Sequence, residues 1–107
     1  MAVDLNRDNY DKEVLESKTP VMVDFWGPQC RPCLALMPAV EKLEKEYGEK
    51  LKVTKVNATE NRMLCAKLRV ISLPAYLFSK NGAEVKRIAG ANTSESDLVN
   101  AIKEIIG

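Results

Sequence analysis

The sequence predicts an α/β fold in which one mixed, five-stranded sheet is flanked by helices on both faces. Short apolar runs alternate with segments of helical periodicity, which is typical of strand–helix–strand units with parallel strands. Asn81-Gly82 lies between two later apolar runs and predicts a β-hairpin, whose strands are antiparallel. The run Val21–Trp26 is apolar at both sets of alternating positions, apart from Asp24, which indicates a central strand covered on both faces.

The length and charge of the chain narrow the class of protein. A chain of 107 residues is expected to form one domain over residues 1–107, large enough for a real core. The net charge of +1 argues against nucleic acid or an anionic membrane as the main partner. No apolar run approaches the roughly 18 residues of a membrane span. The first residues lack the apolar segment of a secretory signal, so the cytoplasm is the expected location.

Local signals set the ends of the expected elements. Asn6 is a suitable N-cap for a first helix, and Gly48 is a suitable stop for a long second one. Ser94 with Asp97 resembles a capping box at the start of a closing helix. The expected strands cover residues 2–5, 21–26, 51–56, 75–78 and 84–88, and the expected helices cover residues 7–17, 30–47, 60–68 and the segment after Ser94.

Two cysteines stand where the central strand gives way to the long helix. Gly27-Pro28 breaks the strand, and Pro32 falls in the first helical turn, where its missing N–H costs nothing. Cys30 and Cys33 are three residues apart, so on a helix their sulfurs are neighbours that can bridge. The open N-terminus of the helix favours a thiolate at Cys30, whereas Cys33 belongs to the buried stripe. The pattern predicts a nucleophile followed by a resolving thiol.

A metal site is the main alternative use of this cysteine pair. Structural zinc needs four ligands, mostly cysteine and histidine, and the chain has no histidine and one further cysteine, Cys65. A closed metal site within one chain is therefore not expected, although a metal or iron–sulfur cluster shared between two chains stays open. Cys65 lies beside Leu64 and Leu68 and is expected to fill the core.

The segment around the cysteines resembles the active site of the thioredoxin family. The resemblance continues in order along nearly the whole chain and implies the thioredoxin fold, with strand order 1-3-2-4-5, and dithiol–disulfide exchange. Gln29 stands where the family usually has tryptophan, Arg31 where it has glycine, and Leu34 where it has a basic residue. These departures bear on reduction potential and partner choice. The matching motifs are Phe25-Trp26, Cys30-x-Pro32-Cys33, Pro38, Lys55, Leu73-Pro74, Asn81-Gly82 and Gly90.

Asp24 is a charged residue in a strand that should be buried on both faces. Burial of a carboxylate raises its pKa because the charged form loses its solvation. The resemblance supports a role for Asp24 as general base for the Cys33 thiol, through a water molecule, with Lys55 moderating its charge. The alternative for Asp24 is that it faces solvent on an edge strand. The alternative for Lys55 is that it is an ordinary solvated lysine.

The resemblance also implies a substrate-binding surface around the sulfurs. A cis bond at Leu73-Pro74 would turn the Leu73 backbone toward them, where it could pair with an extended substrate. Trp26 is expected to pack beside the site, and Arg31 and Pro32 lie between the cysteines. The expected collar through which a partner reaches Cys30 consists of Gly27, Pro28, Leu73, Gly90 and Ala91.

The sequence therefore predicts a thioredoxin-like oxidoreductase that reduces disulfides in protein substrates. Cys30 attacks the substrate, Cys33 resolves the mixed disulfide, and an upstream reductase of the thioredoxin reductase type reopens the Cys30–Cys33 disulfide. We expect a monomer that needs no bound cofactor or metal. The alternatives are a binding or subunit module on the same fold and the metal-bridged dimer.

Overall fold

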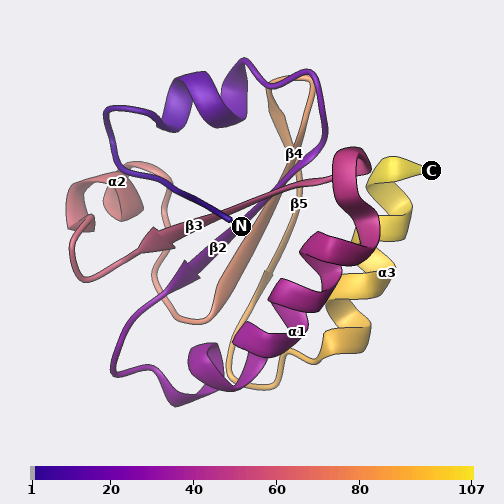
Figure 1. Cartoon of the computed structure of the whole chain (residues 1–107). Coiled ribbons are helices and arrows are strands. Elements are labelled where there is room, and N and C mark those ends of the chain that lie inside the picture. Colours follow the sequence, from indigo (N-terminus) through magenta and orange to yellow (C-terminus); the bar gives the residue numbers. More distant parts are fainter. Residues whose placement is uncertain (1) are drawn as a thin grey trace.

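The computed structural model describes residues 2–107 and contains one five-stranded sheet with helices on both sides (Figure 1). The strand order is β1-β3-β2-β4-β5, as the family resemblance implied. The elements in chain order are β1 (Val3–Asp4), η1 (Asp11–Leu15), β2 (Val21–Trp26), α1 (Arg31–Tyr47), η2 (Gly48–Lys50), β3 (Lys52–Asn57), α2 (Arg62–Lys67), β4 (Ala75–Lys80), β5 (Ala83–Ala89) and α3 (Glu95–Ile106).

The sheet is mixed, as predicted, and β2 lies at its centre. Strand β3 pairs in parallel with both β1 and β2, whereas β4 runs antiparallel to β2 and to β5. The residues Val21–Phe25 are all buried, which confirms a central strand covered on both faces. The β4–β5 turn places Asn81 and Gly82 at positive φ, 55° and 80°, the backbone conformation that favours Asn-Gly in a two-residue hairpin turn.

Different helices cover the two faces of the sheet. Figure 1 shows α1 and α3 together on one side, with α2 and the unlabelled indigo helix η1 on the other. Met22 and Tyr76 pack with α1 and α3, on what we call the α1/α3 face, whereas Val23 and Phe25 pack with η1 and α2. The buried core of the α1/α3 face consists of Met22, Val40, Leu43, Leu51, Val53, Tyr76, Phe78, Leu98, Ala101, Ile102 and Ile105.

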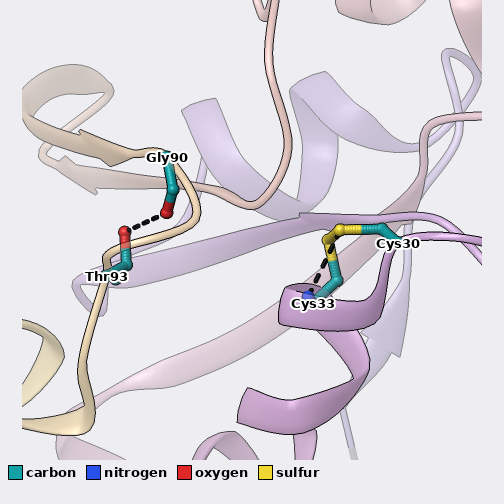
Figure 2. Close-up of a disulfide and its surroundings, with 4 residues drawn as sticks. All are labelled: Cys30, Cys33, Gly90 and Thr93. Atoms are coloured by element: carbon teal, nitrogen blue, oxygen red, sulfur yellow. Dashed lines mark hydrogen bonds between the residues drawn. A yellow bond between two sulfur atoms is a disulfide. The ribbon is translucent and has the colours of Figure 1, made fainter.

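The long helix and the closing helix begin at the predicted caps. Cys30 is the N-cap of α1, which continues as one element through Pro38 to Tyr47. Ser94 and Asp97 form the predicted capping box of α3. Figure 2 shows the start of α1, with the Cys30–Cys33 pair, together with the loop between β5 and α3.

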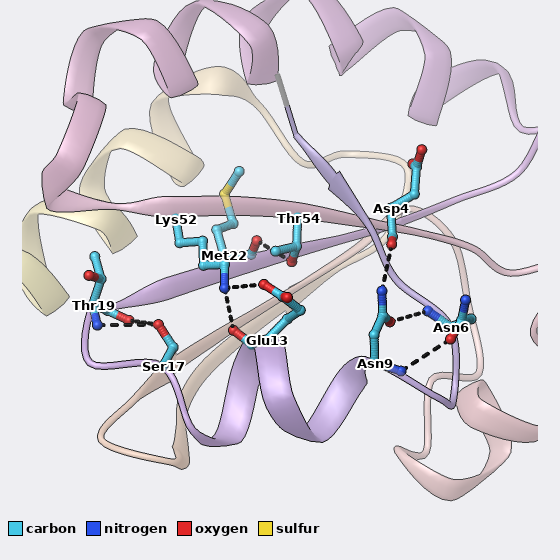
Figure 3. A network of polar contacts seen from close by, with 9 residues as sticks. All are labelled: Asp4, Asn6, Asn9, Glu13, Ser17, Thr19, Met22, Lys52 and Thr54. Carbon is cyan, nitrogen blue, oxygen red and sulfur yellow. Dashed lines mark hydrogen bonds and ion pairs between the residues drawn. The ribbon is translucent and has the colours of Figure 1, made fainter.

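The helix predicted over residues 7–17 is shorter than expected and of a different kind. The Asn6 side chain accepts hydrogen bonds from the N–H groups of Asp8 and Asn9, so residues 6–9 form a turn. The regular segment that follows, η1, is a π-helix, which the Glu16 N–H closes by donating to the Asp11 carbonyl oxygen. Figure 3 shows how Asn9 also donates to the Asp4 carbonyl oxygen, which ties the turn to β1.

Two further features fix the periphery of the sheet. Lys52 of β3 donates to the Glu13 carbonyl oxygen and pairs with the Glu13 carboxylate, which anchors η1 (Figure 3). The guanidinium of Arg87 in β5 donates to the carbonyl oxygens of Leu68 and Arg69, where α2 ends. The helix predicted over residues 60–68 is limited to Arg62–Lys67, because the residues before it form a turn closed by the Glu60 N–H.

Candidate redox site

Cys30 and Cys33 form a disulfide at the start of α1 (Figure 2). Their Cα atoms lie 5.3 Å apart, within the range that a disulfide spans. The Cys30 backbone is extended and its N–H donates to the Gly27 carbonyl oxygen, so the turn after β2 delivers Cys30 to the helix. Pro32 occupies the first turn of α1, as predicted.

The two sulfurs differ in exposure and in hydrogen bonding. Cys33 is 1% exposed, whereas Cys30 is half-buried. The Cys33 N–H donates to the Cys30 Sγ over 3.2 Å, so the capping atom of α1 is the outer sulfur. A free N–H group and the positive end of the helix dipole both stabilise negative charge on that sulfur. The geometry thus separates an accessible sulfur that can carry charge from a shielded one.

Asp24 is a buried carboxyl on the same face of the sheet as α1. It is 1% exposed and lies two residues after Met22, on the α1/α3 face. Among residues 2–107 neither carboxyl oxygen has a hydrogen-bond partner. Burial raises the pKa of Asp24 to about 7, and the positive charge of Lys55 partly opposes this rise. Asp24 is therefore buried as predicted, and the alternative of a solvent-facing aspartate on an edge strand is excluded.

The strands on either side of β2 supply the neighbours of Asp24. Lys55 of β3 is its register partner in the parallel pair, and Tyr76 of β4 is its partner in the antiparallel pair. Tyr76 is fully buried, and burial together with the Asp24 charge raises the pKa of its phenol. In the sequence, Tyr76 is one position in the strand predicted over residues 75–78. The register that places it opposite Asp24 is not visible in the sequence.

Contacts along the chain bring several predicted collar residues together. The Leu73–Pro74 peptide bond is cis, as the resemblance implied. A methyl group on Gly27 would lie 3.4 Å from Leu73 Cδ1, so the two residues face each other closely. The Gly90 N–H donates to the Pro74 carbonyl oxygen, and Gly90 has a φ of 111°, which favours glycine. The turn before Cys30, the Pro74 loop and the loop after β5 therefore form one connected surface.

The remaining predicted site residues lie nearer the solvent. Pro28, Arg31 and Ala91 are exposed, and Trp26 and Pro32 are half-buried. Within the described part of the chain the Arg31 guanidinium makes no ion pair.

Cys65 lies in α2, in the core cluster on the other face of the sheet from α1. It is buried, as expected, and burial raises the pKa of its thiol. Across residues 2–107 no three or more Cys, Asp or Glu side chains gather in a group that could hold a metal ion. None of the helices described is long and apolar enough to span a membrane.

A bridged pair with one accessible and one shielded sulfur, placed where a helix stabilises a thiolate, defines a dithiol–disulfide exchange protein. Comparison with known proteins identifies the family of exchange proteins to which the chain belongs. The thioredoxin family model matches residues 1–104, and the chain belongs to the thioredoxin family. It is accordingly a thiol–disulfide oxidoreductase that acts on disulfide substrates, and neither a pure binding module nor a metal-bridged dimer is favoured.

Its relatives include bacterial and plant thioredoxins. The thioredoxin of Acetoanaerobium sticklandii is 34% identical over 103 residues, which cover 96% of this chain and 98% of that protein. Thioredoxin 1 of Synechococcus elongatus is 39% identical over 93 residues, covering 87% of this chain and 86% of that one. The M-type, chloroplastic thioredoxin of Spinacia oleracea is 39% identical over 103 residues. These residues cover 96% of this chain and 56% of that protein.

Proposed function

We propose that the chain reduces disulfides in protein substrates, with Cys30 as the nucleophile. The Cys30 thiolate attacks one sulfur of the substrate disulfide, and the other substrate sulfur leaves as a thiolate. The Cys33 thiol then loses its proton and attacks Cys30 Sγ, which releases the second substrate sulfur. The substrate gains two electrons and the Cys30–Cys33 disulfide is formed. The observation that carries these roles is the contrast between the half-buried residue Cys30 and the 1% exposed residue Cys33.

We infer that Asp24 is the general base for the Cys33 proton, through a water molecule. A base works best when its pKa lies near the working pH, and burial raises the pKa of Asp24 to about 7. Its position on the α1/α3 face, with both carboxyl oxygens unpartnered within residues 2–107, supports this role. Lys55 assists by favouring the charged form of Asp24.

We propose that an extended segment of the substrate pairs with the backbone of Leu73, next to the cis Pro74. The proximity of Gly27 to Leu73 and the Gly90–Pro74 hydrogen bond support one continuous docking surface. We include in it two exposed apolar side chains that lie close in sequence to Cys33 and Leu73, namely Leu34 and Ile71. The other members of this proposed surface are Trp26, Pro28, Arg31, Pro32 and Ala91.

We further propose that a reductase of the thioredoxin reductase type returns the Cys30–Cys33 disulfide to the dithiol. The chain would then transport two electrons from that reductase to each substrate as a monomer. Because both electrons reside on the cysteine sulfurs, this cycle needs no bound cofactor. A reducing compartment such as the cytoplasm supplies the electrons that the cycle consumes.

Reduction of insulin in the presence of dithiothreitol tests the proposal. Cys30→Ser should abolish catalysis, whereas Cys33→Ser should accumulate a mixed disulfide with the substrate that mass spectrometry detects. Cys65→Ser is the matched control and should leave the rate unchanged, because Cys65 lies in the opposite core cluster. Full activity of Cys30→Ser would refute the assigned nucleophile.

Asp24→Asn tests the general base separately. The amide keeps the shape of the side chain but cannot accept the Cys33 proton. Stopped-flow measurements should show release of the mixed disulfide slowed about tenfold or more at pH 7, with formation of the mixed disulfide nearly unchanged. Equal slowing of both steps would argue against this role.

A further inference from the structure

Asp24 and Tyr76 are opposite each other in the antiparallel pair of β2 and β4. Residues directly opposite in such a pair point their side chains to the same face of the sheet. Both residues are buried, at 1% and 0% exposure, and Tyr76 belongs to the core of the α1/α3 face. A carboxyl and a phenol are therefore buried on the same face of the sheet, next to the apolar core cluster that packs against α1 and α3.

Neither polar group has a hydrogen-bond partner in the described part of the chain. The buried side-chain polar atoms without a partner there are the two Asp24 carboxyl oxygens, Tyr76 Oη, Trp26 Nε1 and Ser79 Oγ. The Asp24 charge nevertheless reaches the phenol, since it raises the pKa of Tyr76 further above the value set by burial. A neutral phenol can donate one hydrogen bond, and an ionised carboxylate can only accept.

Lys55 and Trp26 are the other polar side chains beside Asp24. Trp26 follows Asp24 by two residues on β2, so it points to the same face, and its Nε1 is a second buried donor without a partner among residues 2–107. Lys55 flanks Asp24 from β3 and supplies a positive charge that lowers the pKa of Asp24 in part. The α1 residues Val40 and Leu43 that pack on this face are apolar, and Cys33 is a buried residue of the same helix. The buried residues of α3 on this face are Leu98, Ala101, Ile102 and Ile105.

We propose that Tyr76 is a positioning residue whose hydroxyl donates to the ionised Asp24 carboxylate through one water molecule. Because a hydrogen bond to the charged form favours that form, Tyr76 would keep more Asp24 ready to accept the Cys33 proton. The phenol keeps its own proton throughout, and the proton from Cys33 goes to Asp24. The inference rests on the proposed role of Asp24 as general base.

Tyr76→Phe removes the hydroxyl and keeps the ring. The titration of Asp24, followed by carboxyl ¹³C NMR, should move to higher pH by about half a unit, about threefold in the ratio of ionised to protonated Asp24. Release of the mixed disulfide should slow about two- to threefold at pH 7 and recover at higher pH, while attack by Cys30 stays unchanged. Tyr47→Phe, at the end of α1, is the matched control and should change neither quantity.

A double variant separates this effect from packing. With Asn at position 24, Tyr76→Phe should not slow release any further, because there is no carboxylate to influence. Equal slowing by Tyr76→Phe in both backgrounds, or an Asp24 titration that does not move, would overturn the proposal. If Asp24→Asn alone leaves release unchanged, the general-base role fails, but the NMR titration still decides whether Tyr76 acts on Asp24.

The wild-type protein offers a test that does not depend on the variant folding. The ring signals of Tyr76 should change with pH at the same midpoint as the Asp24 carboxyl signal, in the oxidised and in the reduced protein. The ring signals of Tyr47 should not follow that midpoint. Tyr76 signals that stay constant through the Asp24 titration would contradict the proposed hydrogen bond.

Discussion

Asp24 and Lys55 are register partners in the parallel pair of β2 and β3, so a buried aspartate and a half-buried lysine lie side by side on the α1/α3 face. The two influences on Asp24 oppose each other, since burial raises its pKa and Lys55 lowers it. Burial is the larger of the two, and the pKa stays at about 7. The charge of Lys55 should therefore be measurable in the chemistry of Asp24.

Lys55→Met should raise the pKa of Asp24 above about 7, because it removes the positive charge that lowers this pKa and leaves the burial that raises it. At pH 7 a smaller fraction of Asp24 is then ionised, and release of the mixed disulfide should slow. Carboxyl NMR and stopped-flow kinetics measure the two changes. Lys45→Met, an exposed lysine near the end of α1, is the control. An Asp24 titration that shifts to lower pH would contradict the electrostatic role of Lys55.

Asp24→Asn should stabilise the oxidised protein at pH 8 but not at pH 4. The pKa of Asp24 is higher in the folded chain, about 7, than its ordinary value of 3.8, so the folded state binds more protons between these values. The free energy of unfolding of the wild type therefore falls as pH rises from about 4 to 7, by roughly 4 kcal/mol at most from this group. Asparagine has no such dependence.

Urea unfolding of both proteins at pH 4 and pH 8 measures this difference. Asp8→Asn, at an exposed position, serves as the control for the change of one charge. A variant that is no more stable than wild type at pH 8 would mean that the ionised carboxylate is well solvated in the folded protein.

In the reduced protein, iodoacetamide should modify Cys30 much faster than Cys33 or Cys65 at pH 7. Cys30 is half-buried at the N-terminus of α1, while the other two cysteines are buried. A thiolate is the reacting form, and a helix N-terminus favours it. Timed labelling followed by peptide mass mapping gives the three rates. Similar rates for Cys30 and Cys33 would contradict the assigned roles.

Arg31→Gly should lower the reduction potential of the Cys30–Cys33 couple. The Arg31 guanidinium is always charged, lies next to Cys30 in sequence and favours its thiolate, which exists only in the reduced protein. Arg31 is exposed, so solvent screens the attraction, and the expected change is on the order of 10–20 mV. Equilibration against glutathione gives the potential, and thiolate absorbance should show a smaller thiolate fraction. An unchanged or higher potential would indicate that Arg31 serves only partner recognition.

The sequence predicted the centre of the molecule better than its periphery. Strand β2 has the predicted bounds, and α1 differs only in that Cys30 is its cap, because an apolar run and a helical stripe leave few alternatives. The first helix was wrong in length and kind. There the Asn6 and Asn9 side chains bind nearby backbone groups, and such local competition is not encoded in apolar spacing.

The candidate site could be predicted at those residues whose type is unusual in their sequence context. Cys30, Cys33 and Asp24 stand out because a CxxC pair and a charge in an apolar strand are unusual. Tyr76 does not stand out, since its significance comes only from the register with Asp24. The cis bond before Pro74 likewise required the family resemblance, because X–Pro bonds are mostly trans.

The loop from Leu68 to Pro74 is hydrogen-bonded at its first end to β5 and at its other end to the residue that follows β5. Arg87 bonds the carbonyl oxygens of Leu68 and Arg69 at the first end, and Gly90 bonds the Pro74 carbonyl oxygen at the other. If this loop forms the proposed substrate surface, that surface is already ordered before a substrate binds, so most of the conformational entropy lost on binding is lost by the partner. Partners whose disulfides lie in flexible segments can adapt to this fixed surface, and selection among them depends on how readily such a segment can extend.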